Sequence, residues 1–131
     1  MSASSDARER AMALLYESSI RDLPIDEVLA GLAVDPVPLA RELAVGVAEH
    51  RDALDPVIAA SSVNWPLERM PTMDRTILRL AAYELAERPD VPLAVIIDEA
   101  VELAKRFSTD DSGRFVNGVL SRVAEQLRPA D

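Results

Sequence analysis

The sequence predicts an all-α protein, a compact helical bundle of about seven helices. Apolar side chains recur at helical spacing along most of the chain, strand-like alternation is absent, and most of the nine prolines lie between the periodic segments. The best strand candidate, VPLAVII at residues 91–97, continues as DEAVELAKRF, whose apolar side chains keep to one helical face as far as Phe107. We therefore predict a helix there, with Pro92 at its start.

Four helices are expected in the N-terminal half of the chain, about residues 1–62. In order they span about residues 6–21, 24–33, 38–50 and 52–62. Asp22 is placed to cap the second helix, and Pro24 to occupy its first turn. Pro56 is expected to delay the start of the fourth helix to about Asp55, because proline cannot donate the helical hydrogen bond.

Three stronger helices are expected in the C-terminal half, about residues 66–131. They span about residues 74–88, 93–107 and 112–127, after a single turn near 66–70. Short connections between them favour antiparallel neighbours. We predict one domain covering residues 1–131, built as two helical halves divided near residues 65–71.

Composition narrows the classes of function. The chain has no cysteine and one histidine, His50, which argues against disulfides and thiolate metal sites. The first residues carry no signal-peptide pattern and no apolar run approaches the roughly 20 residues of a membrane span, so a cytoplasmic protein without membrane contact is expected. A net charge of −9 disfavours non-specific binding to nucleic acid, although nine of the 14 basic side chains follow residue 65. Any nucleic-acid site is therefore expected to be local.

The sequence patterns of common enzyme classes are missing. The acidic set Asp98, Glu99 and Glu102 lacks the Glu-x-x-His pairs of a di-iron bundle, so a solvated helix face is the better interpretation. There is no glycine-rich phosphate loop and no nucleophile elbow. A Ser-His-Asp triad stays open, because its members need not be neighbours in sequence. We expect no enzyme, no catalytic residue, no metal and no cofactor.

The first helix carries more apolar surface than a single core contact needs. Beside its core stripe, Ala13, Tyr16 and Ile20 form a second apolar edge about 100–180° away. Two interpretations stay open: the edge meets another helix of the same bundle, or it docks another protein with the tyrosine as anchor.

A row of polar and aromatic residues lies in the helix expected at 74–88. Arg75, Arg79 and Tyr83 repeat there at four-residue spacing, which places them on one face, away from the predicted core stripe. Two arginines beside a phenol suit phosphate and base contacts of a nucleic acid. Ordinary solvated arginines are the alternative.

The stretch DDSGRFVNGVLSRV, residues 110–123, opens the last helix with two of the four glycines and an Arg-Phe pair. Arg114 and Gly118 lie on a small polar face with Phe115 at its border. An unpaired base stacks well on such a ring, while Arg114 or the helix N-terminal amides meet phosphate. In the alternative, residues 110–112 cap the helix and Gly118 permits close packing.

Two segments, DRTILRLAAYEL and DVPLAVIIDEAVELAKRFSTDDSGRFVNGVL, resemble the NusB family of transcription antitermination factors, with FVNGVL as a highly specific part. RERAMALLYE near the start resembles the first helix of that family. The resemblance implies an all-helical protein of two subdomains that pairs with NusE, a small-subunit ribosomal protein. It also implies that the pair binds the boxA element of ribosomal RNA leader transcripts within the antitermination complex of RNA polymerase.

The resemblance assigns residues to two surfaces. Those matching the family's contact with NusE are Tyr16, Ile20 and Glu84. Those matching the region of its RNA path are Arg75, Arg79, Asp111, Arg114 and Phe115, and near the N-terminus Arg8 and Arg10 add to them.

One departure concerns the N-terminus. Family members usually carry a cluster of Arg and Lys before the first helix, whereas this chain begins MSASSDARER, with Arg8 and Arg10 alone. Fewer phosphate contacts predict weaker RNA binding with a flatter salt dependence. We therefore predict an antitermination factor, and keep as the alternative a protein-interaction adaptor or homodimer that has lost most RNA binding.

Overall fold

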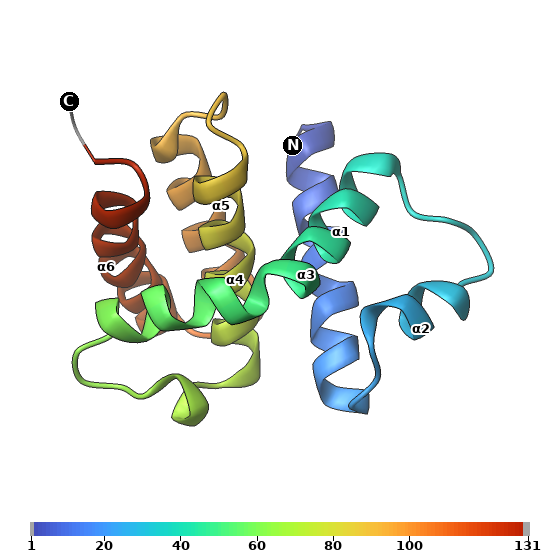
Figure 1. The fold of residues 1–131 in the computed structure, drawn as a ribbon, viewed down its shortest axis with the longest axis horizontal. Coiled ribbons are helices and arrows are strands. Elements are labelled where there is room, and N and C mark those ends of the chain that lie inside the picture. The colour runs from blue at the N-terminus through green and yellow to red at the C-terminus, as the bar shows by residue number, and fades with distance from the viewer. Residues whose placement is uncertain (1, 130–131) are drawn as a thin grey trace.

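The computed structural model describes residues 2–129 and has the all-α architecture predicted from the sequence (Figure 1). Its elements in chain order are α1 (Ala3–Arg21), α2 (Ile25–Ala30), α3 (Pro38–Ser61), the 3-10 turn η1 (Leu67–Arg69), α4 (Thr72–Glu87), α5 (Leu93–Phe107) and α6 (Asp110–Leu127). No strand occurs within the described range. The turn expected near residues 66–70 is η1, and the three helices that follow begin and end close to their predicted positions.

The helices predicted at about 38–50 and 52–62 form a single helix, α3, so the prediction of two was wrong. Pro56 lies inside this helix without ending it. Proline leaves the carbonyl four residues earlier, that of Asp52, without its helical partner. Both residues are exposed, so solvent can hydrate that carbonyl and the cost stays small enough for packing to hold the helix together.

α3 runs through the middle of the molecule (Figure 1). It packs against α1, α4 and α6, and Figure 1 shows it crossing the middle of the fold from the side of α1 to the side of α6. Buried residues occur along it from Ala40 to Ser61. At its end, the Arg122 Nε of α6 donates to the Ser61 carbonyl at 2.6 Å. α1, α4 and α6 therefore share α3 as a packing partner.

α4 is surrounded by other helices, since it packs against α1, α3, α5 and α6. Every residue from 76 to 85 is buried. The predicted free face of Arg75, Arg79 and Tyr83 is therefore wrong for two of its members: Arg79 and Tyr83 are each 8% exposed. Periodicity separates the apolar from the polar side of a helix, but it does not show that neighbours also cover the polar side.

The Tyr83 ring packs onto α3 at Gly46. A Cβ at position 46 would lie 2.3 Å from both Cζ and Oη of the ring, so this crossing needs glycine. The His50 ring meets Tyr83 edge-on, with centroids 5.3 Å apart. Burial first, and then the charge of Glu42, raises the pKa of the Tyr83 phenol.

α5 and α6 form a helical hairpin across a two-residue connection. Thr109 caps α6, because its Oγ1 accepts a 3.0 Å hydrogen bond from the Ser112 amide; the cap predicted at residues 110–112 lies one residue too late. The hydroxyls of Ser108 and Ser112 donate to Oδ1 of the buried Asp74 at 2.7 and 3.2 Å. These bonds tie the start of α6 to α4.

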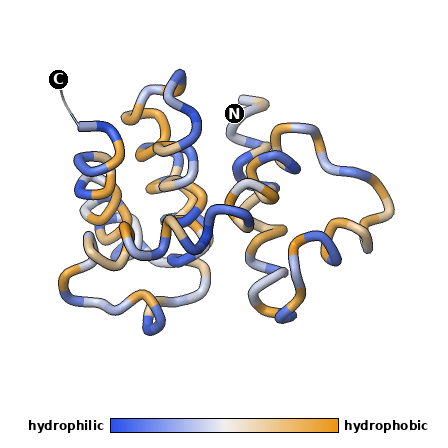
Figure 2. Tube along the Cα trace, viewed as in Figure 1, coloured by the Kyte–Doolittle hydropathy of each residue, from blue (hydrophilic) through white to orange (hydrophobic). Residues whose placement is uncertain are grey.

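Apolar residues gather where the helices face one another, and polar residues dominate the outer turns (Figure 2). Some large apolar side chains stay exposed, namely Ile20, Val34, Val37, Val63, Leu93, Val95 and Phe107. Among the helices described, none combines the length and apolar character that crossing a membrane requires.

Candidate functional site

The first two turns of α6 present an arginine and an aromatic ring at the surface. The Arg114 side chain is 79% exposed and forms an ion pair with the exposed Asp111. Phe115 is half-buried and packs against the edge of the core. Exposed ion pairs contribute about 0–1 kcal/mol, so Arg114 can exchange Asp111 for a phosphate at little cost. Three residues assigned to the RNA surface thus lie together.

Phe115 contacts Trp65, a residue that the sequence-based prediction did not include. Their ring centroids are 5.0 Å apart and their planes are inclined by 64°. Trp65 precedes η1 in the segment that was interpreted as a divider between the two halves. The signal that could have drawn attention to it is that it is the only tryptophan of the chain.

Another aromatic ring is exposed at the end of α5. Phe107 is 40% exposed, and the Arg106 guanidinium lies over its ring, 4.8 Å from the centroid. The apolar period had placed Phe107 on the core face, which is wrong. Because α5 ends at this residue and the chain turns into α6, its last apolar position lies at the rim of the core.

The two α4 arginines are held by other groups of the protein. Arg79 donates from Nε and Nη2 to the two carboxylate oxygens of Asp55, at 2.8 and 3.0 Å. Arg75 donates to the carbonyls of Leu67 and Glu68 at 3.4 and 3.2 Å, and so fastens η1 to α4. The expectation that Arg79 is a free phosphate-binding group is corrected, because its guanidinium is buried and paired.

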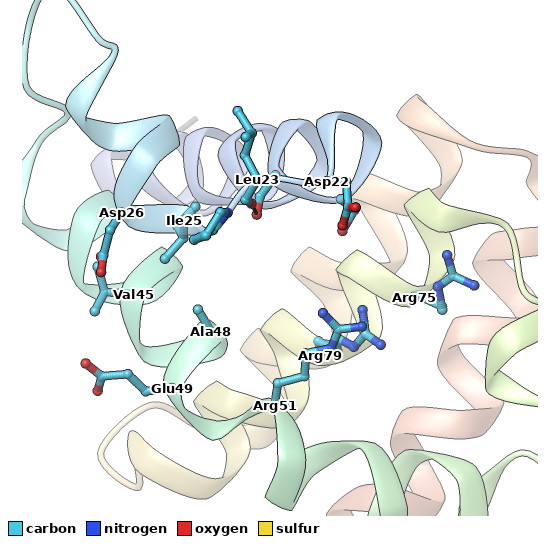
Figure 3. Close-up of a pocket in the computed structure, with 13 residues that line it drawn as sticks. Asp22, Leu23, Ile25, Asp26, Val45, Ala48, Glu49, Arg51, Arg75 and Arg79 are labelled. Atoms are coloured by element: carbon cyan, nitrogen blue, oxygen red, sulfur yellow. Dashed lines mark hydrogen bonds between the residues drawn. The ribbon is translucent and has the colours of Figure 1, made fainter.

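Both arginines line an open cleft of about 670 Å³ between the α1–α2 connection, α3 and α4 (Figure 3). Arg51 joins them, with its Nε 3.7 Å from the carboxylate that also binds Arg79. Asp22, Asp26 and Glu49 line the cleft as well, so its charges balance. A balanced cleft does not concentrate polyanions in the way that a basic groove does.

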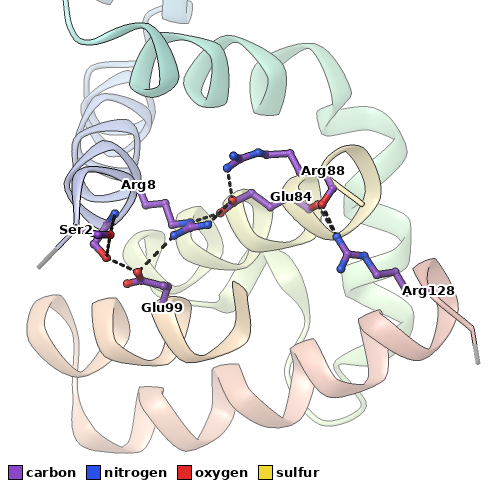
Figure 4. A network of polar contacts seen from close by, with 7 residues as sticks. Ser2, Arg8, Glu84, Arg88, Glu99 and Arg128 are labelled. Atoms are coloured by element: carbon purple, nitrogen blue, oxygen red, sulfur yellow. Dashed lines mark hydrogen bonds and ion pairs between the residues drawn. The ribbon is translucent and has the colours of Figure 1, made fainter. Parts of the chain in front are cut away.

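Arg8 and Glu84 form a buried ion pair, which corrects both predictions made for them (Figure 4). Their side chains are 5% and 2% exposed, and the two contacts measure 2.8 Å from Nε to Oε2 and 3.0 Å from Nη2 to Oε1. Both side chains are buried, so Arg8 cannot contact RNA directly and Glu84 cannot contact a protein partner directly. The pair instead fixes α1 against α4.

Glu84 is the centre of a larger network. Arg88 Nη1 donates to Glu84 Oε1 at 2.8 Å, and Arg8 Nη1 lies 3.4 Å from Glu99 Oε1 on α5. Arg128 donates to the Glu84 and Arg88 carbonyls at 3.3 and 2.6 Å, and it also reaches the carbonyls of Leu85 and Val91. The network binds α1, α4, α5 and the segment after α6 to one another.

The outer edge of α1 is left partly open. Ile20 is 58% exposed, Ala13 is exposed and Tyr16 is half-buried. The interpretation that another helix of the bundle covers this edge is therefore wrong for Ile20 and Ala13. Arg10 is also exposed, beside the 34–39 segment.

Comparison with known proteins agrees with this all-α arrangement. A family model described as NusB family matches residues 5–125. The chain belongs to the NusB family. The transcription antitermination protein NusB of Sorangium cellulosum (strain So ce56) is 47% identical over 137 residues, which cover 100% of this chain and 98% of that protein. The NusB protein of Bacillus subtilis (strain 168) is 44% identical over 124 residues, 92% of this chain and 94% of that protein.

Solved structures show the same NusB fold. A T. maritima NusB structure superposes with a TM-score of 0.88 at 33% identity, over 98% of this chain and 95% of that one. A structure of antitermination factors NusB and NusE in complex with dsRNA gives a TM-score of 0.80 at 24% identity, over 96% and 99% of the two chains. At that identity the second likeness concerns the fold alone.

Proposed function

We propose that this NusB-family chain is a transcription antitermination factor that pairs with NusE and binds boxA-like single-stranded RNA of ribosomal RNA leader transcripts. It would act in the cytoplasm, within the antitermination complex of RNA polymerase. The observation that carries the RNA half is the start of α6, where the exposed Arg114 adjoins Phe115. Identities of 44–47% to proteins named transcription antitermination protein NusB support the family role, and a solved neighbour holds NusB, NusE and RNA together.

The chemistry of the α6 start suits an unpaired nucleotide. The half-buried Phe115 offers part of its ring to a base, and Arg114 supplies donors for the adjacent phosphate. Asp111 moderates the local positive charge, because it pairs with Arg114 in the absence of RNA. Stacking is sequence-tolerant, so base preference must come from further contacts or from NusE.

Affinity for RNA is expected to depend on the partner. Arg8 is neutralised inside the protein by Glu84, so Arg10 remains as the exposed arginine near the N-terminus of α1. Each phosphate contact releases counterions and adds to affinity, and this surface makes few of them. We propose that NusE docks on the α1 edge around Tyr16 and Ile20 and supplies additional RNA contacts.

Fluorescence anisotropy of a labelled boxA RNA, at two salt concentrations and with and without NusE, tests the proposal. We expect weak binding by the chain alone and tighter binding by the pair. If the chain binds NusE but the boxA RNA binds neither the chain nor the pair, the protein-interaction adaptor is favoured instead. The molar mass from light scattering shows whether the chain alone forms a dimer, which an exposed apolar edge can favour.

Replacing Arg114 with alanine is expected to lower RNA affinity by roughly fivefold, as the loss of one phosphate contact costs about 1 kcal/mol. The slope of log affinity against log salt should flatten by about 0.7, the value for one phosphate of a single strand. Arg41→Ala removes an equal charge at the start of α3, where the side chain is 51% exposed, and serves as the control. Equal losses for both variants would mean that general electrostatics, rather than a contact at α6, accounts for the effect.

Replacing Ile20 with aspartate is expected to weaken NusE binding by at least about tenfold, because a charge then lies in an apolar contact. The free energy of unfolding should change by less than about 0.5 kcal/mol, since the side chain is already 58% exposed. Val34→Asp, at a side chain 79% exposed in the α2–α3 connection, is the matched control. Calorimetric titration with NusE measures the affinity of both variants, and urea unfolding measures their stability. Unchanged affinity for Ile20→Asp would place the partner elsewhere.

A further inference from the structure

The segment that carries Trp65 is fastened from several sides. The Ser62 hydroxyl donates to the Trp65 carbonyl at 2.7 Å, and Arg75 holds the carbonyls of Leu67 and Glu68 in η1. Met70, which follows η1, is 3% exposed. A ring on a loop held in this way needs little further ordering when a ligand binds, which favours affinity.

Trp65 and Phe115 together form a corner of two aromatic rings. Both are half-buried, so each keeps part of its surface open to solvent while the rest packs against the core. The planes are inclined by 64° and the centroids lie 5.0 Å apart, an edge-to-face arrangement. A base that stacks on the open part of one ring therefore lies close to the other ring as well.

Charge at this corner is nearly balanced. Arg69 and Arg114 are exposed on the two segments that meet here, but Glu68 and Asp111 are exposed beside them. Phosphate pairing alone therefore gives this surface little advantage over the rest of an acidic protein. Stacking on aromatic rings does not depend on net charge, so the rings are the feature that can retain RNA here.

We propose that Trp65 is a base-stacking residue of the RNA surface, acting together with Phe115. This inference rests on the proposed function, since it adds a second ring to the same site. The ligand is an unpaired base of single-stranded RNA. A base pair in a duplex is already stacked and cannot open onto the corner without losing its own neighbours.

The emission of Trp65 provides a direct test, because it is the only tryptophan of the chain. Unlabelled boxA RNA is added to the NusE complex, and the same complex carrying Trp65→Phe supplies the background from the partner. We expect quenching that saturates at the RNA concentration where anisotropy of a labelled RNA also saturates. A duplex of the same sequence should quench much less.

Two variants complete the test. Trp65→Leu keeps an apolar side chain without a ring and is expected to weaken RNA binding on the order of tenfold to a hundredfold, whereas Trp65→Phe should restore most of it. NusE binding by both variants reports that the protein is folded. RNA binding with unchanged Trp65 emission, and with Trp65→Leu equal to the unaltered chain, would overturn this inference and leave the proposed function standing. Absence of RNA binding by the unaltered complex would overturn the proposed function itself.

Discussion

Replacing Glu84 with leucine is expected to lower the free energy of unfolding by about 3–5 kcal/mol. The substitution leaves Arg8, whose side chain is 5% exposed, without its two short contacts at 2.8 and 3.0 Å. Within residues 2–129, Arg8 then keeps its 3.4 Å contact with Glu99. A buried guanidinium with a single long ionic contact is strongly disfavoured, and urea unfolding at neutral pH measures the loss.

Two further variants identify burial as the cause. Glu9→Leu breaks the 2.8 Å pair with Arg106, whose members are 35% and 39% exposed, and should cost less than about 1 kcal/mol. Combining Arg8→Met with Glu84→Leu removes both buried charges and should recover much of the stability. Similar losses for the Glu9 and Glu84 variants would contradict the buried network. A loss of NusE binding in a Glu84 variant must therefore be compared with its loss of folding stability.

Replacing Gly46 with alanine is expected to cost about 2–3 kcal/mol of unfolding free energy through overpacking. The new Cβ would lie 2.3 Å from Cζ and Oη of Tyr83, which real Cβ atoms essentially never do, so α3 and α4 must separate or the ring must leave its site. Alanine gains about 1 kcal/mol over glycine in helix propensity, but that gain is smaller than the clash. Thermal or urea unfolding gives the net change.

Gly118 on α6 is the matched control for Gly46. A Cβ there meets nothing nearer than Arg122 Nη1 at 3.9 Å, so Gly118→Ala should be neutral or stabilising by up to about 1 kcal/mol. Adding Tyr83→Leu to Gly46→Ala removes the ring atoms in conflict, and the double variant should lose less than the sum of the two single changes. Strict additivity would show that the ring is not the cause.

The sequence allowed the helical elements to be predicted because their apolar period is strong and their loops are marked by proline. It failed at α3, where Pro56 suggested a break, whereas the helix continues through a turn whose residues Asp52 and Pro56 are both exposed. Local rules give the cost of a proline. They do not give the packing energy along the rest of the helix, which decides whether the helix continues through the proline.

The candidate site was predicted in part. Asp111, Arg114 and Phe115 lie within one short segment at the start of α6, so the sequence alone predicts that they are close together. The roles of Arg8 and Glu84 depend on a contact between residues 76 positions apart, and a single sequence does not show whether a charged side chain is exposed or paired inside. The contact between Trp65 and Phe115 is likewise a product of tertiary structure.

Photo-crosslinking of a boxA RNA to the complex with NusE, followed by mass spectrometry of the peptides, tests the central claim most directly. If the start of α6 and the Trp65 segment form the RNA surface, crosslinks should fall within residues 62–71 and 110–122 and should decrease in the Arg114→Ala and Trp65→Leu variants. Crosslinks confined to α2 and the first half of α3, with none in those two segments, would contradict it.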